Sequence, residues 1–246
     1  MSDTSRPVAL VTGAARRIGA VIARRLHREG HDLALHYRHS GDAMDALRTE
    51  LEATRPGSVL TLQADLDDVD TLPPLVAATV ARYGRLDALV NNASSYFATP
   101  VGSTTPAQWD ALFGSNCRAP FFLSQAAAPH LAVANGAIVN LVDIYARRPL
   151  PGHPVYCMAK AALAMMTRSL AVELGPHVRV NGVAPGNVLW SDNPDKAETL
   201  AIVVARTALR RQGTPDDIAG AVWTCLDSPY MTGQVIAIDG GRSLFI

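Results

Sequence analysis

Short apolar segments alternate along the chain with longer segments in which apolar residues recur every three or four positions. A short apolar run is typical of a strand buried on both faces, and the longer spacing is typical of a helix with one buried face. Strands are expected at residues 8–11, 32–37, 59–63, 86–91, 137–142, 177–183 and 234–238. Helices are expected at residues 16–29, 42–53, 69–83, 106–134 with an interruption near Pro120, 155–174, 195–210 and 216–226.

This alternation of strands and helices indicates the fold class. Parallel strands joined by right-handed crossovers form a doubly wound α/β sheet with helices on both faces, and ligands bind at the carboxyl ends of the strands. No linker-like segment divides the 246 residues, so we expect one domain over 1–246 with a disordered tail at 1–6. No uninterrupted apolar run approaches the roughly 18 residues that span a bilayer.

The charge balance and the cysteines narrow the class of partner. Lys plus Arg and Asp plus Glu each number 22, and a net charge of zero argues against a general binder of nucleic acids or anionic membranes. We therefore expect a small-molecule partner. Cys117, Cys157 and Cys225 lack metal-ligand spacing, so we interpret them as free thiols and expect no metal site. With the polar N-terminus, these features favour a soluble cytoplasmic protein.

The first strand leads through a glycine-containing turn into the first helix. Gly13 and Gly19 bracket this turn. Glycine there lets a pyrophosphate approach the backbone, and the free amides and positive dipole end of the helix attract the anion. The segment is a candidate nucleotide site, although similar glycines also occur in ordinary connections between a strand and a helix.

Polar residues after the second and third strands indicate which nucleotide would bind. An NAD site places an acid after the second strand, whereas Arg38, within Tyr37-Arg38-His39-Ser40, offers a guanidinium suited to a 2′-phosphate. NADPH is therefore favoured, and a solvated basic loop is the alternative. Asp65-Leu66, after the third strand, falls where an adenine would lie, but an Asp at a helix start is as often a cap.

Tyr156 and Lys160 form the strongest chemical pair in the sequence. They are four residues apart near a helix start, so both lie on one face. The phenol, with a reference pKa of about 10, is a poor acid at neutral pH, and we expect the neighbouring ammonium to stabilise its anion and ease proton donation. A half-buried Tyr beside a Lys that reaches solvent is the alternative, since such pairs are frequent on helices.

Several of these motifs occur together, and their combination resembles the short-chain dehydrogenase/reductase superfamily, with its Rossmann-type fold, over nearly the whole chain. The shared motifs are the turn from Thr12-Gly13 to Gly19, Asn91-Asn92-Ala93, Asn116, Tyr156 with Lys160, Pro185-Gly186 and Asp239-Gly240-Gly241. More specific features resemble the pteridine reductases within that superfamily. These are Arg17 at the usual middle glycine, His36-Tyr37-Arg38-His39-Ser40, Asn92-Ala93-Ser94-Ser95 and Val142-Asp143 before Tyr156.

The resemblance implies roles for residues at the matching positions. Tyr156 would donate the proton, Lys160 would bind the nicotinamide ribose and tune Tyr156, and Asn116 would support a water-filled proton path. The implied cofactor-binding residues are Gly13, Arg17, Ile18, Gly19, Tyr37, Arg38, His39, Ser40, Asp65, Leu66, Asn92, Ala93, Ser94, Tyr156, Lys160, Pro185 and Gly186. The implied substrate-binding residues are Arg17, Ser94, Tyr96, Asp143 and Tyr156.

Asp143 occupies the position where most of the superfamily has a catalytic Ser. A Ser can hydrogen-bond a carbonyl oxygen that develops negative charge, whereas an ionised carboxylate would repel it. A ring C=N bond that accepts a hydride needs a proton on its nitrogen, which a Tyr with a carboxyl partner can supply and replenish. Pterin reduction is such a reaction, and the resemblance implies a pterin held between the nicotinamide and Tyr96 and contacted by Arg17. In the alternative, Tyr96 only covers a loop and Asp143 caps a turn or pairs with Arg147 or Arg148.

The segment after Pro185-Gly186 departs from the superfamily pattern. Asn187-Val188-Leu189 follows it, where many members have, a few residues on, a Thr that holds the nicotinamide amide. We expect residues 189–199 to cover the substrate.

Three functions stay open from the sequence. We favour an NADPH-dependent reductase of dihydropterins, with oxidised pterins or dihydrofolate as further substrates. The alternatives are a carbonyl or hydroxysteroid-type reductase and a non-catalytic NADP-binding sensor, which the intact Tyr156 and Lys160 disfavour. The resemblance also implies a homotetramer, with the helices at 106–134 and 155–174 at an interface and the apolar tail from Arg242 to Ile246 packed on a neighbouring subunit.

Overall fold

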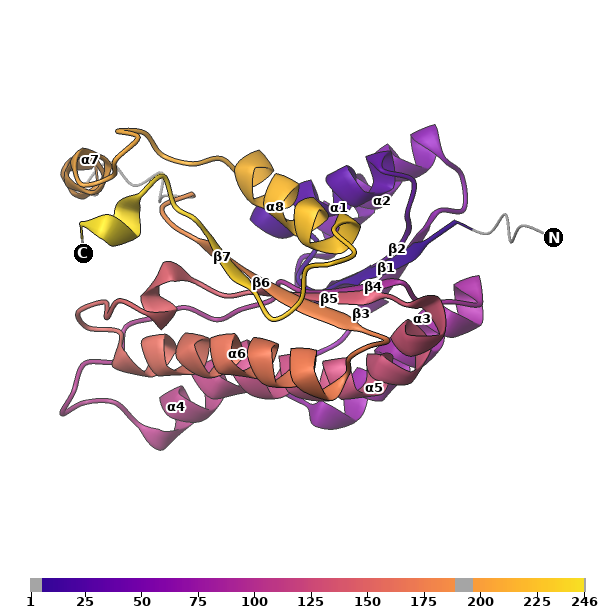
Figure 1. Ribbon diagram of the computed structural model, residues 1–246, viewed down its shortest axis with the longest axis horizontal. Coiled ribbons are helices and arrows are strands. Elements are labelled where there is room, and N and C mark those ends of the chain that lie inside the picture. Colours follow the sequence, from indigo (N-terminus) through magenta and orange to yellow (C-terminus); the bar gives the residue numbers. More distant parts are fainter. Residues whose placement is uncertain (1–5, 189–196, 246) are drawn as a thin grey trace.

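Figure 1 shows one sheet of seven strands in the structure, a computed structural model that describes residues 6–188 and 197–245. The strands are β1 (Val8–Val11), β2 (Asp32–Tyr37), β3 (Val59–Gln63), β4 (Ala88–Asn91), β5 (Ala137–Leu141), β6 (Arg179–Pro185) and β7 (Val235–Ile238). They lie in the order β3-β2-β1-β4-β5-β6-β7, and each neighbouring pair is parallel. The order reverses between β1 and β4, and a crevice opens beyond their carboxyl ends.

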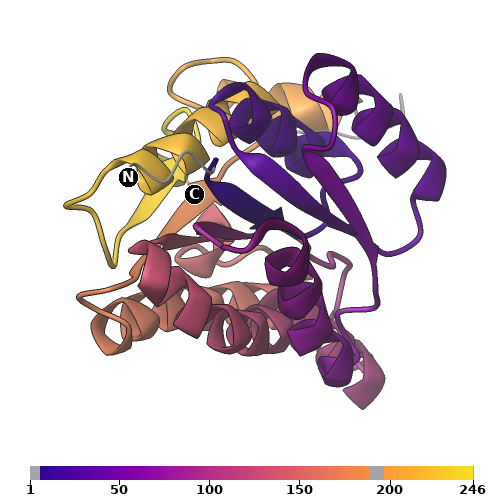
Figure 2. The ribbon, with the colours of Figure 1, turned by 90° about the vertical axis from the view of Figure 1, so that its right-hand side faces the viewer.

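Helices cover both faces of the sheet (Figures 1 and 2). One face carries α1 (Arg17–Arg28), α2 (Gly41–Thr54) and α8 (Pro215–Asp227), and the other carries α3 (Leu72–Tyr83), α4 (Pro106–Phe113), α5 (Ala119–Ala134) and α6 (Pro154–Glu173). The short α7 (Ala197–Ala205) lies near the C-terminal end of the chain. Each face has its own buried core, with Ile22 and Val222 in the first and Leu72 and Leu123 in the second.

The predicted α/β fold with a seven-stranded parallel sheet is confirmed, and the helix predicted at 106–134 is interrupted near Pro120, as expected. The interruption is a π-helical turn, Gly114–Arg118, that ends just before Pro120. Pro120 stands in the first turn of α5, where the missing N–H needs no helical partner, so it is compatible with the helix. The strand expected at 177–183 is shifted to Arg179–Pro185, and the helix expected at 69–83 begins as a 3-10 turn, Val69–Thr71. Residues 1–5 of the expected tail and 189–196 of the expected cover lie outside the described residues.

By length and composition alone, α6 could cross a membrane. It has 20 residues and a mean hydropathy of 1.2, and it is the one helix in the described part of the chain that meets this test. Half of the span is buried inside the protein, where Leu163, Ala164 and Met166 pack against Val142 and Ala184. These contacts identify α6 as a core helix, and its N-terminal half reaches the edge of the sheet where the crevice opens.

Candidate active site

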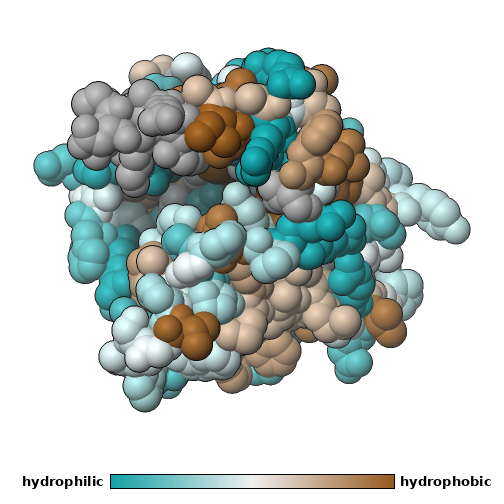
Figure 3. Space-filling model, turned by 90° about the vertical axis from the view of Figure 1, so that its left-hand side faces the viewer, coloured by the Kyte–Doolittle hydropathy of each residue, from teal (hydrophilic) through white to brown (hydrophobic). Residues whose placement is uncertain are grey.

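A cleft of about 1280 Å³ lies beyond the carboxyl ends of the strands, on the side of the molecule that Figure 3 shows hollowed. With one exception, every residue proposed from the sequence for the cofactor, the substrate or catalysis lines this cleft. The exception is Asn116, which is fully buried. The structure therefore brings together motifs that are up to 173 residues apart between Gly13 and Gly186. One cleft of this size has room for a dinucleotide and a second small molecule.

The turn after β1 requires glycine at two positions. Gly13 has a φ of 62°, and a Cβ on Gly19 would lie 2.2 Å from the Gly13 carbonyl oxygen. The Gly13 N–H donates to His36 Nδ1 at 3.2 Å, and His36 Nε2 lies 3.1 Å from the Ala64 carbonyl oxygen. Burial lowers the pKa of His36, and a neutral ring with its proton on Nε2 satisfies both contacts. The turn thus has the close, side-chain-free backbone that a pyrophosphate needs.

Arg17 replaces the usual middle glycine but keeps a backbone conformation that favours glycine. Its φ is 53°, in the left-handed region, which costs a residue with a Cβ about 1–2 kcal/mol. Arg17 begins α1 and lines the cleft. The strained position brings a guanidinium to the N-terminus of the helix, where an anion would bind.

Thr12 and Asn92 tie the ends of β1 and β4 together. Thr12 Oγ1 accepts the backbone N–H groups of Asn92 at 2.9 Å and of Ala93 at 3.0 Å. The side-chain amide of Asn92 donates to the carbonyl oxygens of Thr12 at 2.9 Å and of Gly13 at 3.0 Å. These four bonds hold the segment that begins with Asn92-Ala93 along the floor of the cleft.

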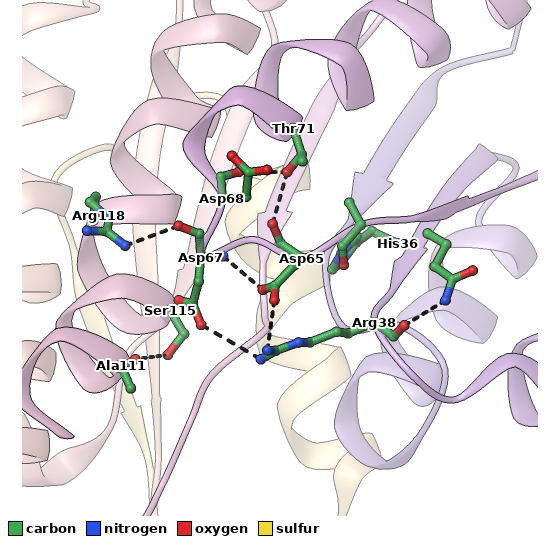
Figure 4. A network of polar contacts seen from close by, with 11 residues as sticks. His36, Arg38, Asp65, Asp67, Asp68, Thr71, Ala111, Ser115 and Arg118 are labelled. Atoms are coloured by element: carbon green, nitrogen blue, oxygen red, sulfur yellow. Dashed lines mark hydrogen bonds and ion pairs between the residues drawn. The ribbon is translucent and has the colours of Figure 1, made fainter. Parts of the chain in front are cut away.

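Arg38 lies at the end of β2 between two carboxylates (Figure 4). Its Nη2 is 2.7 Å from Asp65 Oδ2, and its Nη1 is 3.7 Å from Asp67 Oδ2. Asp65 Oδ1 accepts the Asp67 N–H at 3.1 Å, while the cap of the next turn is Asp68, so Asp65 does not act as that cap. Burial raises the pKa of Asp67, and the Asp65 charge adds to the rise. Ion pairs as exposed as that of Arg38 are weak, and a 2′-phosphate would compete for this guanidinium.

Tyr156 is hydrogen-bonded to Asp143. Its hydroxyl donates to Asp143 Oδ2 at 2.7 Å, while Asp143 Oδ1 accepts the Tyr145 N–H at 2.9 Å. The cap considered from the sequence therefore exists, but one carboxylate oxygen provides it and the other binds the phenol. Arg147 and Arg148 are exposed, and neither forms an ion pair with Asp143 among the described residues. Burial raises the pKa of Asp143 and of Tyr156, and the Asp143 charge raises the pKa of Tyr156 further.

The expectation that Lys160 stabilises the Tyr156 phenolate is wrong in this structure. Lys160 Nζ donates to the Leu141 carbonyl oxygen at 2.8 Å and lies 5.8 Å from the centroid of the Tyr156 ring. Burial raises the pKa of Tyr156, and the Asp143 carboxylate, which is hydrogen-bonded to the phenol, raises it further. Burial lowers the pKa of Lys160 to about 8, against the opposing effect of Asp143. Lys160 is therefore a buried cation on the same face of α6 as Tyr156.

Asn116 lies in the π-helical turn, behind the surface of the cleft. Its Nδ2 donates to the carbonyl oxygens of Ser95 at 2.9 Å and of Leu112 at 3.0 Å. Its Oδ1 is buried and has no hydrogen-bond partner among the described residues. A buried acceptor of this kind suits an ordered water molecule, which is the role that the resemblance implies for Asn116.

Tyr96 lies beside Tyr156 at the rim of the cleft. The two rings meet edge to face with centroids 4.9 Å apart, and Tyr96 stacks on His153 at 4.8 Å and 7°. The Tyr96 side chain is 58% exposed. It therefore has both the position and the accessible surface that stacking on a flat substrate requires.

The cleft also contains residues to which the sequence analysis gave no role in the site, among them Asp67, Tyr145 and Arg242. Asp67 lies two residues after Asp65, and Tyr145 lies two residues after Asp143. This spacing from a selected residue could have identified both of them from the sequence. The expectation for Arg242 is corrected by the structure. We assigned it to an apolar tail packed on a neighbouring subunit, but it is 8% exposed within its own chain. The Asp239-Gly240-Gly241 turn before it folds the chain back toward the cleft.

Comparisons with known proteins match nearly the full length of this chain. The model of the family described as enoyl-(acyl carrier protein) reductase covers residues 13–243. Pteridine reductase 1 of Leishmania tarentolae is 38% identical, over 99% of this chain and 98% of that protein. A putative ketoacyl reductase of granaticin polyketide synthase from Streptomyces violaceoruber is 38% identical over 97% and 96%. The 3-oxoacyl-[acyl-carrier-protein] reductase FabG of Thermotoga maritima is 34% identical over 95% and 96%.

Proposed function

We propose that this chain, which belongs to the short-chain dehydrogenase/reductase superfamily and is pteridine reductase-like within it, reduces dihydropterins with NADPH. Membership of that superfamily makes it an NAD(P)H-dependent oxidoreductase. The choice of NADPH rests on Arg38, and the choice of a pterin rests on the hydrogen bond between Tyr156 and Asp143.

The residues of the cleft fit a dinucleotide cofactor. The Gly13–Gly19 turn presents backbone to the pyrophosphate, and a Cβ at Gly19 would collide with that backbone. Arg38 would hold the 2′-phosphate, Asp65-Leu66 would flank the adenine, and Lys160 would hold the nicotinamide ribose. When bound, the cofactor supplies a hydride to a carbon of the substrate.

The pair formed by Tyr156 and Asp143 supplies the proton that the other end of a C=N bond needs. When Asp143 is protonated, the hydrogen bond between the two groups reverses, so that Asp143 donates to the phenol oxygen while Tyr156 gives its hydroxyl proton to the ring nitrogen. One hydride and one proton thereby convert C=N to CH–NH, and no free phenolate forms. This route suits a phenol whose pKa is raised and a carboxyl whose pKa is raised toward the protonated form.

Reduction of a carbonyl is the second candidate, because two of the relatives described above are named ketoacyl reductases. A carbonyl substrate develops negative charge on oxygen, which a preorganised donor stabilises. Asp143, when ionised, opposes that charge. When protonated, Asp143 can instead reload Tyr156 after a ring nitrogen has been protonated, so the presence of this group favours the pterin.

The test is NADPH oxidation by the purified protein with dihydrobiopterin, with a simple ketone, with a 3-ketoacyl thioester and without substrate. We expect turnover with dihydrobiopterin at least tenfold faster than with either carbonyl compound, and loss of that turnover in Tyr156→Phe. Faster reduction of a carbonyl compound would overturn the proposal. Tight NADPH binding without reduction of any substrate would favour a sensor instead.

A further inference from the structure

The segment that carries Tyr96 is fixed on both sides of this residue. On one side, the Ser95 carbonyl oxygen accepts a hydrogen bond from Asn116 Nδ2 at 2.9 Å. On the other side, Thr99 is fully buried. Its N–H donates to the Gly152 carbonyl oxygen at 2.7 Å, and its Oγ1 accepts a backbone N–H from the first turn of α6 at 3.4 Å. These contacts hold the loop after β4 against the segment that leads into α6.

His153 lies in the segment that leads into α6, and its ring has a partner of its own. The residue directly precedes α6, and its Nδ1 is 3.0 Å from the Pro151 carbonyl oxygen, which accepts a proton carried on Nδ1. The His153 N–H donates to the Leu150 carbonyl oxygen at 3.1 Å, and the His153 carbonyl oxygen accepts the Cys157 N–H at 3.1 Å. The position of the imidazole is therefore set by the backbone around it.

The His153 ring stacks on the Tyr96 ring from outside the cleft. The ring centroids are 4.8 Å apart and the planes differ by 7°, and Tyr96 lines the cleft whereas His153 does not. Tyr96 also meets the Tyr156 ring at 83°, with centroids 4.9 Å apart. A tyrosine side chain that is 58% exposed can occupy several rotamers, and these two ring contacts favour the one in the structure.

We propose that His153 is a positioning residue, whose ring supports the Tyr96 ring from behind and keeps it in place to stack on a flat substrate. The inference rests on the proposed function, because Tyr96 is the ring on which the pterin would stack. Without this support, substrate binding would also have to order the Tyr96 side chain, which lowers affinity. The hydrogen bond between Tyr156 and Asp143 does not involve His153, so the proton transfer should be little affected.

The test measures dihydrobiopterin reduction by the wild type, His153→Ala and His153→Phe. We expect His153→Ala to raise KM for dihydrobiopterin about threefold to tenfold, the scale of one aromatic pair, and to change kcat by less than about twofold. The Kd of dihydrobiopterin for the complex with NADP⁺, measured by calorimetry, should rise by the same factor. His153→Phe keeps a ring behind Tyr96 and should restore most of the affinity.

A double-mutant cycle distinguishes support of Tyr96 from direct contact between His153 and the substrate. In a Tyr96→Ala background, His153→Ala should raise KM no further, because the ring that it supports is gone. An equal rise in that background would overturn the inference while pterin reduction stands. An unchanged KM when His153→Ala is the only substitution would overturn it as well.

His177→Ala is the matched control, since His177 is exposed and does not line the cleft. Thermal unfolding of each variant identifies any loss of fold. If His153→Ala loses its fold, the same cycle is run with His153→Leu, which fills the space without a ring that stacks. A wild type that does not reduce dihydrobiopterin would overturn the proposed function, and the role of His153 with it.

Discussion

The Tyr156 hydroxyl is hydrogen-bonded to the Asp143 carboxylate at 2.7 Å, and not to the ammonium of Lys160 on the next turn of its own helix. Two groups this close share their protons, so they titrate as one unit. The carboxyl group of Asp143 beside the proton donor distinguishes this site from one in which a Ser faces the substrate. It also makes Asp143 the residue whose replacement tests the chemistry most directly.

Asp143→Asn should lower kcat for dihydropterin by roughly 10² or more, the scale for loss of a general acid, with little change in KM for NADPH. The amide keeps the shape of the carboxyl group but cannot pass on a proton. Steady-state kinetics with dihydrobiopterin measure the effect, and Tyr156→Phe should be at least as damaging. Asp143→Ser recreates the residue that most of the superfamily uses. If Asp143→Ser reduces dihydrobiopterin as fast as the wild type, the role given to Asp143 is wrong.

NADPH binding should weaken as the pH rises through about 8. Burial lowers the pKa of Lys160 to about 8, so the cation is present below that pH and is lost above it. Loss of a charge-assisted hydrogen bond to the ribose should raise the Kd of NADPH by about tenfold. Fluorescence titrations between about pH 7 and 10 measure this change, on a range that avoids the histidines. The Lys160→Met variant should bind NADPH weakly, without a rise in Kd as the pH increases. A pH-dependent rise in Kd that persists in this variant would assign the titration to another group.

Arg38→Ala should raise KM for NADPH by about tenfold or more and barely change KM for NADH. The guanidinium is the group placed to bind the 2′-phosphate, which NADH lacks. Asp67→Asn is the informative companion, because it removes a negative charge 3.7 Å from Arg38 and should tighten NADPH binding. Equal losses with both cofactors in Arg38→Ala would contradict the assignment.

Tyr96→Ala should chiefly raise KM for the pterin, because stacking holds the ring before and during hydride transfer. Tyr96→Phe keeps the ring and should be nearly silent. The accessible surface of Tyr96 and its stacking on His153 make this loop residue a preformed platform. A drop in kcat with unchanged KM in Tyr96→Ala would instead indicate a role in proton transfer.

We expect a homotetramer in solution. Exposed apolar side chains lie on α4, α5 and α6, where the resemblance places a subunit interface, and these are Trp109, Phe121, Phe122, Met158 and Met165. Light scattering at micromolar concentration checks the mass. Met165→Glu should shift it to a smaller species with unchanged circular dichroism, because a buried interface disfavours an unpaired charge. A monomer mass for the wild type would refute the expectation.

The strands were predictable because a parallel sheet buried on both faces leaves a plain apolar run, such as Val8–Val11. The residues that line the cleft were largely predictable because most of them follow those strands. An interruption near Pro120 was predictable, but its π-helical form was not, because Pro120 itself stands in the first turn of α5. The direction of the Tyr156 pKa was also missed, because spacing along one helix says nothing about Asp143, which comes from a different segment of the chain.

The position of Arg242 was not predictable for the same reason, because it depends on contacts between distant segments of the chain. The apolar C-terminal segment favoured packing on a neighbouring subunit, whereas the turn at Asp239 brings Arg242 into the cleft, where its Nη1 donates to the Arg206 carbonyl oxygen. Likewise, the bond from the Gly13 N–H to His36 crosses between two strands, so no local pattern predicts it.

The left-handed backbone of Arg17 sets the stability of the turn after β1 against the binding role that we propose for this residue. Glycine would relax the backbone there by about 1–2 kcal/mol, enough to raise the melting temperature by a few degrees. Directed evolution for heat resistance alone would therefore drift toward glycine at this position and lose the guanidinium at the head of α1. A screen that also demands turnover would keep Arg17 and gather its stabilising changes elsewhere.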